Sequence, residues 1–318
     1  MGSQKYQLSA FSLLPLASSH KPQTIPIFVS MDNDKEVEAL LMLIEDPDAE
    51  VFEAVSNRII AYGTPIIANL EDLWGNTADD SVQERIELLI HRLHFTSLKT
   101  DFTAWGDAPH HELLPGALLV AKLLYPDLHT GKVIQDIERL RRNIWIELNN
   151  YLTPLEQVNV VNSILYNYFG LKGVPAADQR PNDFLISHII ESKKGNQSGN
   201  GVLYLLLMEL LDVPVRLLNI PNQFVLGYFK SKTDNHTEKL HLNIEFFIDP
   251  TNGQMFSHND LYNYFNRTST PVKPEYFRPQ NNKQIIEKLL HNLGQCYTAD
   301  NQAYMLSEIE ELTAILRN

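Results

Sequence analysis

Apolar residues along this chain follow two different periods. Through roughly the first two thirds they recur every three or four positions, which predicts a succession of amphipathic helices. Residues 202–211 (VLYLLLMELL) are apolar on nearly every side and predict a helix that is buried all round. The period then shortens, and three strands are expected over residues 215–218, 223–229 and 242–248. Helices follow again, over residues 260–265, 283–297 and 303–316, and this order predicts an α+β fold.

The helices in the first part of the chain are short and separated by sharp turns. An Asp-Pro-Asp turn ends the first of them, and we expect Asp46 to cap the next helix with Pro47 at its first position. Gly63 interrupts the pattern again. Paired helices of this kind resemble HEAT-type units, which stack because one pair cannot bury its apolar face alone. The sequence predicts an irregular arm over residues 1–30, a HEAT-like helical region over 31–109 and a second domain over 110–318.

Composition and charge narrow the possible partners. The 318 residues are 44% apolar and 20% charged, which is enough for a real hydrophobic core. Acidic residues outnumber basic ones by 39 to 26, for a net charge of −13, and this argues against a nucleic-acid partner because phosphates attract clustered Lys and Arg. The single cysteine, Cys296, excludes an intramolecular disulfide and a Cys-rich zinc site. His91 and His94 have no third ligand at a recognisable spacing, so no metal and no cofactor are expected.

Targeting signals are weak. No run approaches the 18 or so apolar residues of a membrane span, so none is expected. Residues 8–17 (LSAFSLLPLA) could imitate the apolar part of an export signal, but the stretch is short, contains Pro15 and has one charge before it. The expected location is the cytoplasm, with export as the alternative.

Three short motifs in the second domain resemble those of a known family. Residues 193–214 (KKGNQSGNGVLYLLLMELLDVP) contain a basic residue, a glycine-rich turn, the buried helix and a proline exit. Residues 219–227 (NIPNQFVLG) and 247–253 (FIDPTNG) contain a loop with its strand and a strand with its turn. These motifs resemble the signature of bacterial transglutaminase-like proteins, and residues 286–297 (IEKLLHNLGQCY) resemble the helix after the core in the SirB-type branch. The resemblance implies a papain/transglutaminase-like core, in which the buried helix packs on a small antiparallel sheet, followed by C-terminal helices.

The same resemblance implies where a catalytic triad would lie. Active members use a Cys-His-Asp triad, in which the thiol begins the buried helix, where the helix dipole and the imidazole lower its pKa. The imidazole then moves a proton and the carboxylate orients the imidazole. In this chain the nucleophile turn, residues 195–201 (GNQSGNG), has no cysteine, and Gln197, Ser198 or Gly199 takes the thiol position depending on the alignment. Gln223 takes the histidine position and has no titratable group, whereas Asp249 takes the carboxylate position. The triad is therefore expected to be degenerate.

Three functional hypotheses follow from these residues. The first is a non-catalytic transglutaminase-like protein, a pseudoenzyme that acts as a binding or regulatory module for a protein or peptide partner. The second is a hydrolase or acyltransferase without cysteine, which uses Ser198 with Asp249 and an unplaced histidine, namely His236, His241 or His258. The third is a helical scaffold that binds partners through residues 31–109.

Several of these residues also have plain structural explanations. The carboxylate of Asp249 can cap its own turn, and Ser198 and Asn200 can cap the buried helix. Cys296 lies on an apolar helix, where a buried and inert thiol is the expectation. The basic cluster at residues 139–142, beside Trp145, could bind an acidic partner, although a solvated helix face is the simpler interpretation.

Overall fold

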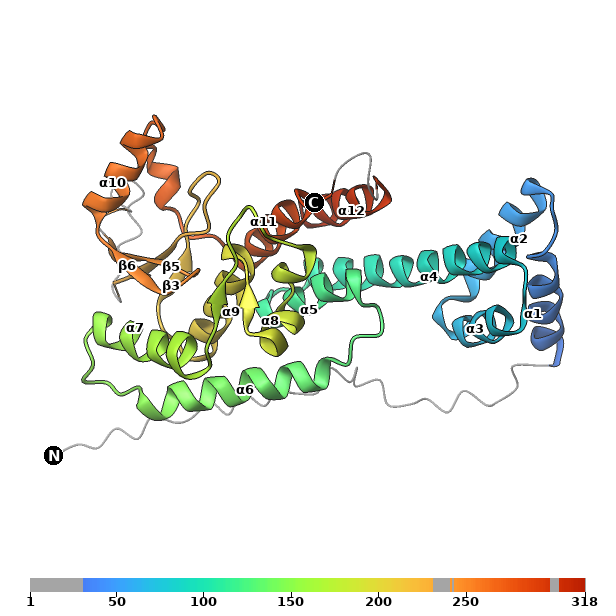
Figure 1. Ribbon diagram of the computed structural model, residues 1–318, viewed down its shortest axis with the longest axis horizontal. Helices are drawn as coiled ribbons and strands as arrows, with labels where there is room; N and C mark the ends of the chain where they lie inside the picture. Colours follow the sequence, from blue (N-terminus) through green and yellow to red (C-terminus); the bar gives the residue numbers. More distant parts are fainter. Residues whose placement is uncertain (1–30, 231–240, 242, 298–302, 318) are drawn as a thin grey trace. The chain divides into compact units, whose positions relative to one another are not determined.

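The computed structural model describes residues 31–230, 241, 243–297 and 303–317 (Figure 1). The expected N-terminal arm, with its apolar stretch at residues 8–17, and His236 lie outside these residues. Within them helices predominate, and a four-stranded antiparallel sheet is present. The predicted α+β class, with a buried helix on a small antiparallel sheet, is confirmed. In the described part of the chain, no helix combines the length and the apolar character that crossing a membrane requires.

The chain divides into two compact units, Met1–Ile90 and His91–Asn318. The described elements of the first unit are α1 (Met31–Leu43), α2 (Ala49–Tyr62), the 3₁₀ turn η1 (Thr64–Ile66), α3 (Ile67–Asn76) and the first turns of α4 (Asp80–Asp107). Val55, Ile59, Leu70 and Ile86 are buried in this unit. The HEAT-like character of the region and the expected boundary at residues 109–110 stay predictions.

The turn between α1 and α2 corrects one expectation. Asp48, and not Asp46, caps α2, because its carboxylate accepts the N–H of Glu50 at 2.8 Å. Asp46 instead accepts the N–H of Asp48 at 2.9 Å, so Pro47 lies in the turn and outside the helix. The Arg85 guanidinium donates to the carbonyl of Asp46 and fixes the turn from α4. Two aspartates could each cap this helix, and the later one, Asp48, does so.

The second unit contains the remaining elements. Its helices and short helical turns after α4 are α5 (Leu113–Leu124), α6 (Thr130–Glu147), α7 (Pro154–Asn162), the π-helical η2 (Ser163–Tyr168), η3 (Pro181–Phe184), α8 (Ile186–Ser192), α9 (Gln197–Leu210), α10 (His258–Arg267), η5 (Pro274–Phe277), α11 (Asn282–Gly294) and α12 (Ala303–Arg317). Its strands are β1 (Lys172–Gly173), β2 (Lys194–Gly195), β3 (Val215–Leu217), β4 (Leu226–Phe229), β5 (Ile244–Asp249) and β6 (Gln254–Phe256).

Helix α9 is the centre of this unit. Residues 198–208 are all buried, and α5, α6, α8, α11 and β3 contact the helix (Figure 1). The sheet has the order β3-β4-β5-β6 and is covered on both faces. Phe246 and Ile248 of β5 belong to the large core around α9, whereas Phe247 belongs to a smaller cluster with Leu261 and Phe265 of α10. The end of β5 lies beside the start of α9, since a Cβ at Gly201 would lie 3.2 Å from the ring of Pro250.

A partly buried ion pair connects α4 to α12 within the second unit. The His91 Nε2 lies 2.6 Å from Oε1 of Glu308, whose side chain is only 11% exposed. Tyr304 packs edge-on against the imidazole, with ring centroids 5.4 Å apart. The hydrogen bond to Glu308 raises the pKa of His91, against the opposing effect of burial. Because Oε2 of Glu308 is buried and finds no partner among the described residues, this carboxylate depends strongly on His91.

We predict that this pair makes the stability of the protein depend on pH. A histidine whose pKa is raised in the folded state stabilises the fold fully below its unfolded pKa of about 6.5, and this contribution is lost as the pH rises through the folded value. His91→Ala should cost about 1–3 kcal/mol near pH 6, because it leaves the Glu308 carboxylate unpaired, and less near pH 9. Urea unfolding at several pH values measures the difference.

His91→Gln is the matched control, since its amide can donate a hydrogen bond to Glu308 but does not titrate. At pH 6, His91→Gln should lose less unfolding free energy relative to the wild type than His91→Ala does. Equal effects of His91→Ala at pH 6 and pH 9 would show that the pair does not carry a pH-dependent free energy.

Candidate functional site

The start of α9 is set by the residues before it. Asn196 is the N-cap, and its side-chain oxygen accepts the N–H of Gly199 at 2.8 Å, so the expectation that Ser198 or Asn200 caps this helix is wrong. The preceding helix ends at Lys193, which takes the left-handed conformation (φ 58°). Gly195 allows a close approach, because a Cβ there would lie 2.3 Å from Oδ1 of Asn200. With Asn196 as the cap, Gln197 is the first residue of the helix.

Gln197 contacts both of the other expected triad positions. Its Nε2 donates to Oε1 of Gln223 and to Oδ1 of Asp249, each at 3.4 Å, which is the long end of the hydrogen-bond range. Its Oε1 accepts the main-chain N–H of Phe224 at 3.2 Å. The side chains of Gln197, Gln223 and Asp249 are all half-buried. The start of α9, the loop before β4 and the end of β5 therefore bring two amides and one carboxylate together.

Asp249 also organises the turn that follows it. Its Oδ1 accepts the N–H of Thr251 at 2.9 Å, and its main-chain carbonyl accepts the N–H of Gly253 at 2.8 Å. Gly253 has φ of +75°, a conformation that residues with a Cβ rarely adopt. The turn-capping contact predicted for Asp249 is present, and the same carboxylate meets Gln197.

A buried polar network from α7, η2 and α9 supports the turn after β5. The Tyr166 hydroxyl donates to the carbonyl of Pro250 and the Asn162 amide donates to the carbonyl of Gly253, both at 2.7 Å. Tyr204, in the middle of α9, donates its hydroxyl to Oδ1 of Asn162 at 3.0 Å. Burial raises the pKa of Tyr166 and of Tyr204, so both hydroxyls remain protonated donors at neutral pH.

Two features of the sequence could have revealed this network. Asn162 and Tyr166 are four residues apart, which places them on one face of a helix, and Tyr204 has the only hydroxyl within the apolar run at 202–211. A buried tyrosine needs a hydrogen-bond partner for its hydroxyl. The local spacing, however, does not show that Tyr204 pairs with Asn162, or that Asn162 and Tyr166 contact the turn after β5.

The loop that carries Gln223 is fixed from two sides. On α9, a Cβ at Gly201 would lie 2.3 Å from the ring of Phe224, so only glycine allows the helix and the loop to approach this closely. On α11, the ammonium of Lys288 donates to the carbonyls of Ile220 at 3.0 Å and Gln223 at 2.6 Å. Burial lowers the pKa of Lys288 to about 8. Main-chain contacts therefore position Gln223, whatever its side chain does.

Ser198 and Gly199 point away from this cluster. The Ser198 hydroxyl is buried and accepts a hydrogen bond from Nδ2 of Asn292 at 2.7 Å. A Cβ at Gly199 would lie 2.4 Å from the carbonyl of Asp183, so this position faces the segment before α8. Of the three residues that could take the thiol position, the structure brings only Gln197 into hydrogen-bond contact with Gln223 and Asp249.

Two of the three histidines considered as helpers for Ser198, His241 and His258, are described, and they lie in another part of the second unit. The ring of His258 packs against Phe247 with centroids 4.9 Å apart, and its Nε2 lies 3.0 Å from the carbonyl of His241. His241 in turn packs against Phe277. These rings border the smaller core cluster between the sheet and α10, and no hydrogen bond links either of them to Ser198 among the described residues.

The remaining candidate residues have structural surroundings. Cys296 is half-buried, and burial raises the pKa of its thiol, which keeps it protonated and poorly nucleophilic at neutral pH. No group of three or more His, Cys, Asp or Glu side chains within the described residues could hold a metal ion. The side chains that meet at the Gln197 cluster are two carboxamides and one carboxylate.

The fold and the placement of these residues define a class of protein. The family model of the transglutaminase-like superfamily matches residues 131–291, and the chain belongs to this superfamily. Protein SirB1 of Salmonella typhimurium strain LT2 is 21% identical over 202 residues, which cover 63% of this chain and 71% of SirB1. Protein YchA of Escherichia coli K12 is 21% identical over 193 residues, or 60% of this chain and 68% of YchA. The chain is a SirB-type transglutaminase-like protein. No solved structure matches it.

We predict that Gly201→Ala disturbs the candidate site. The added methyl group collides with the Phe224 ring and should displace the loop that carries Gln223, at a cost of about 1–3 kcal/mol in unfolding free energy. Gly131→Ala, at a helix position of the same unit with open space around it, should be neutral or slightly stabilising. Urea unfolding of both variants checks the difference, and equal stabilities would mean that α9 and the loop are not in close contact.

Proposed function

We propose that this protein is a non-catalytic member of the superfamily, a pseudoenzyme that acts as a binding or regulatory module for a protein or peptide partner. The observation that carries the proposal is the contact of Gln197 with Gln223 and Asp249. Acyl transfer of the family type needs a thiolate and a group that takes and returns a proton. Carboxamides supply neither near neutral pH, since they do not titrate.

The assignment of Gln197 to the thiol position is part of this proposal. It is supported by the place of Gln197 at the first position of α9, where a helix dipole would act on a thiol. It is also supported by the two contacts that Gln197 makes from one side chain. Gln223 and Asp249 then take the histidine and carboxylate positions, and Ser198 has a structural role through Asn292.

The proposal keeps the domain division expected from the sequence. Residues 110–318 form the transglutaminase-like domain with its C-terminal helices, and residues 31–109 form a HEAT-like region after the arm at 1–30. The cytoplasm is the proposed location. A partner contact through residues 31–109, as in a scaffold protein, is compatible with a non-catalytic core, because neither requires chemistry at Gln197.

We predict that two substitutions create a reactive thiol. On a Cys296→Ser background, Gln197→Cys with Gln223→His should react with iodoacetamide at pH 7 about tenfold faster or more than Gln197→Cys alone, because an imidazole in contact lowers the pKa of the thiol. Mass spectrometry of the labelled peptide measures the rate. Ser198→Cys with Gln223→His is the control and should react slowly, since this side chain is buried against Asn292. Faster labelling at 198 than at 197 would place the thiol position at Ser198 and refute the assignment.

We also predict that the natural protein lacks hydrolase activity at this site. Hydrolysis of p-nitrophenyl acetate should proceed at the same rate with the wild type, Ser198→Ala and Asp249→Asn. A rate that falls at least tenfold in Ser198→Ala, while circular dichroism shows a folded protein, would replace this proposal by the serine hydrolase hypothesis.

A further inference from the structure

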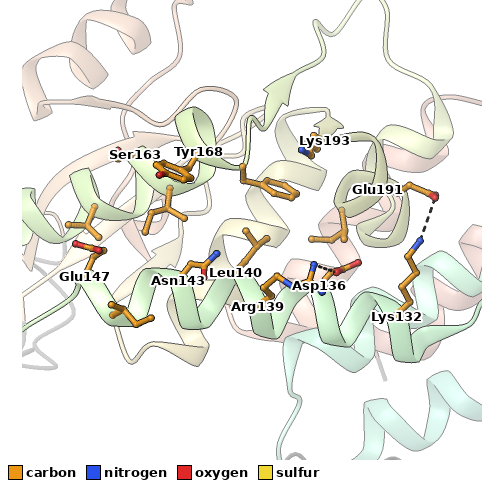
Figure 2. A pocket seen from close by; sticks show the side chains of 15 residues that line it. Lys132, Asp136, Arg139, Leu140, Asn143, Glu147, Ser163, Tyr168, Glu191 and Lys193 are labelled. Carbon is orange, nitrogen blue, oxygen red and sulfur yellow. Dashed lines mark ion pairs between the residues drawn. The ribbon is translucent and has the colours of Figure 1, made fainter.

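A groove on the second unit lies outside the Gln197 cluster. It runs along α6, has η2 and α8 as its opposite wall, and has a volume of about 870 Å³ (Figure 2). A second hollow of about 590 Å³ continues it toward the start of α6, and the two share Lys132, Asp136, Ile190 and Glu191. None of the residues Gln197, Gln223 and Asp249 lines either hollow. The groove is therefore independent of the function proposed for that cluster.

The groove is elongated and open along its side. Figure 2 shows Glu147 and Tyr168 at one end and Lys132 with Glu191 at the other. Lys132 and Glu147 are fifteen positions apart on α6, which corresponds to roughly 22 Å at the rise of an α-helix. The side chains of Ile146 and Tyr168 at the rim are 70% and 90% exposed. A small molecule is usually enclosed by its pocket, whereas an open trough of this length suits a chain segment.

The floor and the rim of the groove are apolar. Leu140 and Ile190 are buried in the floor, and Ile164 and Phe169 are half-buried beside them. Further exposed apolar side chains lie at the end of α6 and in the following turn and helix: Trp145, Tyr151 and Leu155. Exposed apolar groups of this number, rich in aromatic rings, are typical of protein interaction surfaces.

Two of the charged side chains that line the groove are available to pair with an occupant. Lys132 pairs with Glu191 at 3.8 Å and Arg139 pairs with Asp136 at 3.0 Å. Arg141 and Arg142, on the same helix, both pair with Glu138, whose single carboxylate offsets one of their two positive charges. Two charged lining side chains have no ion pair among the described residues, Glu147 at the C-terminus of α6 and Lys193, whose ammonium lies over the ring of Phe169.

An occupant of the groove should carry groups opposite in charge to Glu147 and Lys193. A cation is favoured at Glu147, because the carboxylate and the negative end of the α6 dipole act in the same direction. An anion is favoured at Lys193. The lining carries three acidic and three basic side chains, and without a net positive charge it offers little attraction to an anionic membrane surface.

The conformation of the occupant follows from its main chain. The lining elements α6, η2 and α8 are helical, and their backbone groups are used within the helices, so they offer no strand edge to an extended peptide. An extended occupant would leave its own N–H and C=O groups unpaired against an apolar floor, which is costly. A helix satisfies these groups internally and buries one apolar face, as in other helix-in-groove contacts.

We propose that this groove binds an amphipathic helix of a partner protein. The helix has apolar residues at i, i+3 or i+4, and i+7 against Leu140, Phe169 and Ile190, a basic residue that reaches Glu147 and an acidic residue that reaches Lys193. It spans about three to four turns, which matches the length of the groove along α6.

The proposal can be tested with the full-length protein and peptides selected by phage display from a random 16-residue library. Selected peptides should share the apolar helical spacing, with Lys or Arg near one end and Asp or Glu further along. Fluorescein-labelled synthetic copies should bind with a Kd that rises at least tenfold in Ile146→Glu and in Tyr168→Glu. Val272→Glu, which also introduces an acid at an exposed apolar position but lies outside the groove, should bind like the wild type.

A charge exchange tests the orientation of the partner helix. Lys193→Glu should weaken the selected peptides about fivefold or more, and replacing their acidic residue by Lys should restore binding to this variant and weaken binding to the wild type. Peptides without helical apolar spacing, unchanged binding to Ile146→Glu and Tyr168→Glu, or selection of no binder would overturn the proposal. Binding to phosphatidylglycerol vesicles that Ile146→Glu abolishes would assign the surface to membranes instead.

Gln197→Ala should leave the Kd of the selected peptides unchanged. A loss of binding in this variant would contradict the independence of the groove, and the iodoacetamide experiment reports on the triad positions separately.

Discussion

The burial of α9 on every side is the constraint on which the rest of the second unit depends. A helix with eleven consecutive buried residues has no solvent face, so every neighbour must supply an apolar surface or a hydrogen-bond partner. Tyr204 shows the second requirement, because its hydroxyl is paired with Asn162 in the middle of the core. The same packing brings the first turn of α9 against the Phe224 loop through Gly201. The position of Gln197 beside Gln223 and Asp249 is a consequence of this packing.

The sequence predicts the main elements because each carries a strong local signal. The apolar run at 202–211, its Asp-Val-Pro exit and the following strands identify the core, and the family motifs point to Gln223 and Asp249. The long α4 is less apparent, since its periodicity beyond residue 93 is weaker than that of the earlier helices. Where strong local patterns and tertiary packing agree, the expected element is the one observed.

The sequence could not show which residue caps a helix or which residue takes the thiol position, because several similar residues compete for each place. Gln197, Ser198 and Gly199 are neighbours, and successive helical residues point in directions about 100° apart. The choice of Asn196 as N-cap sets which of the three faces β5, and several polar residues of that turn could have capped the helix. Asp46 and Asp48 present the same problem at α2. In both cases neighbouring residues have similar capping preferences, so the local pattern does not single out the residue that caps the helix.

Lys288 fixes the main chain of the loop before β4 and does so independently of the side chain at position 223. The ammonium reaches the carbonyls of Ile220 and Gln223, and these atoms are present in every amino acid. The backbone at 223 therefore keeps its course whether the residue there is an imidazole or an amide. A scaffold built in this way can exchange the side chain at this position, a proton-transfer group included, without rebuilding its architecture.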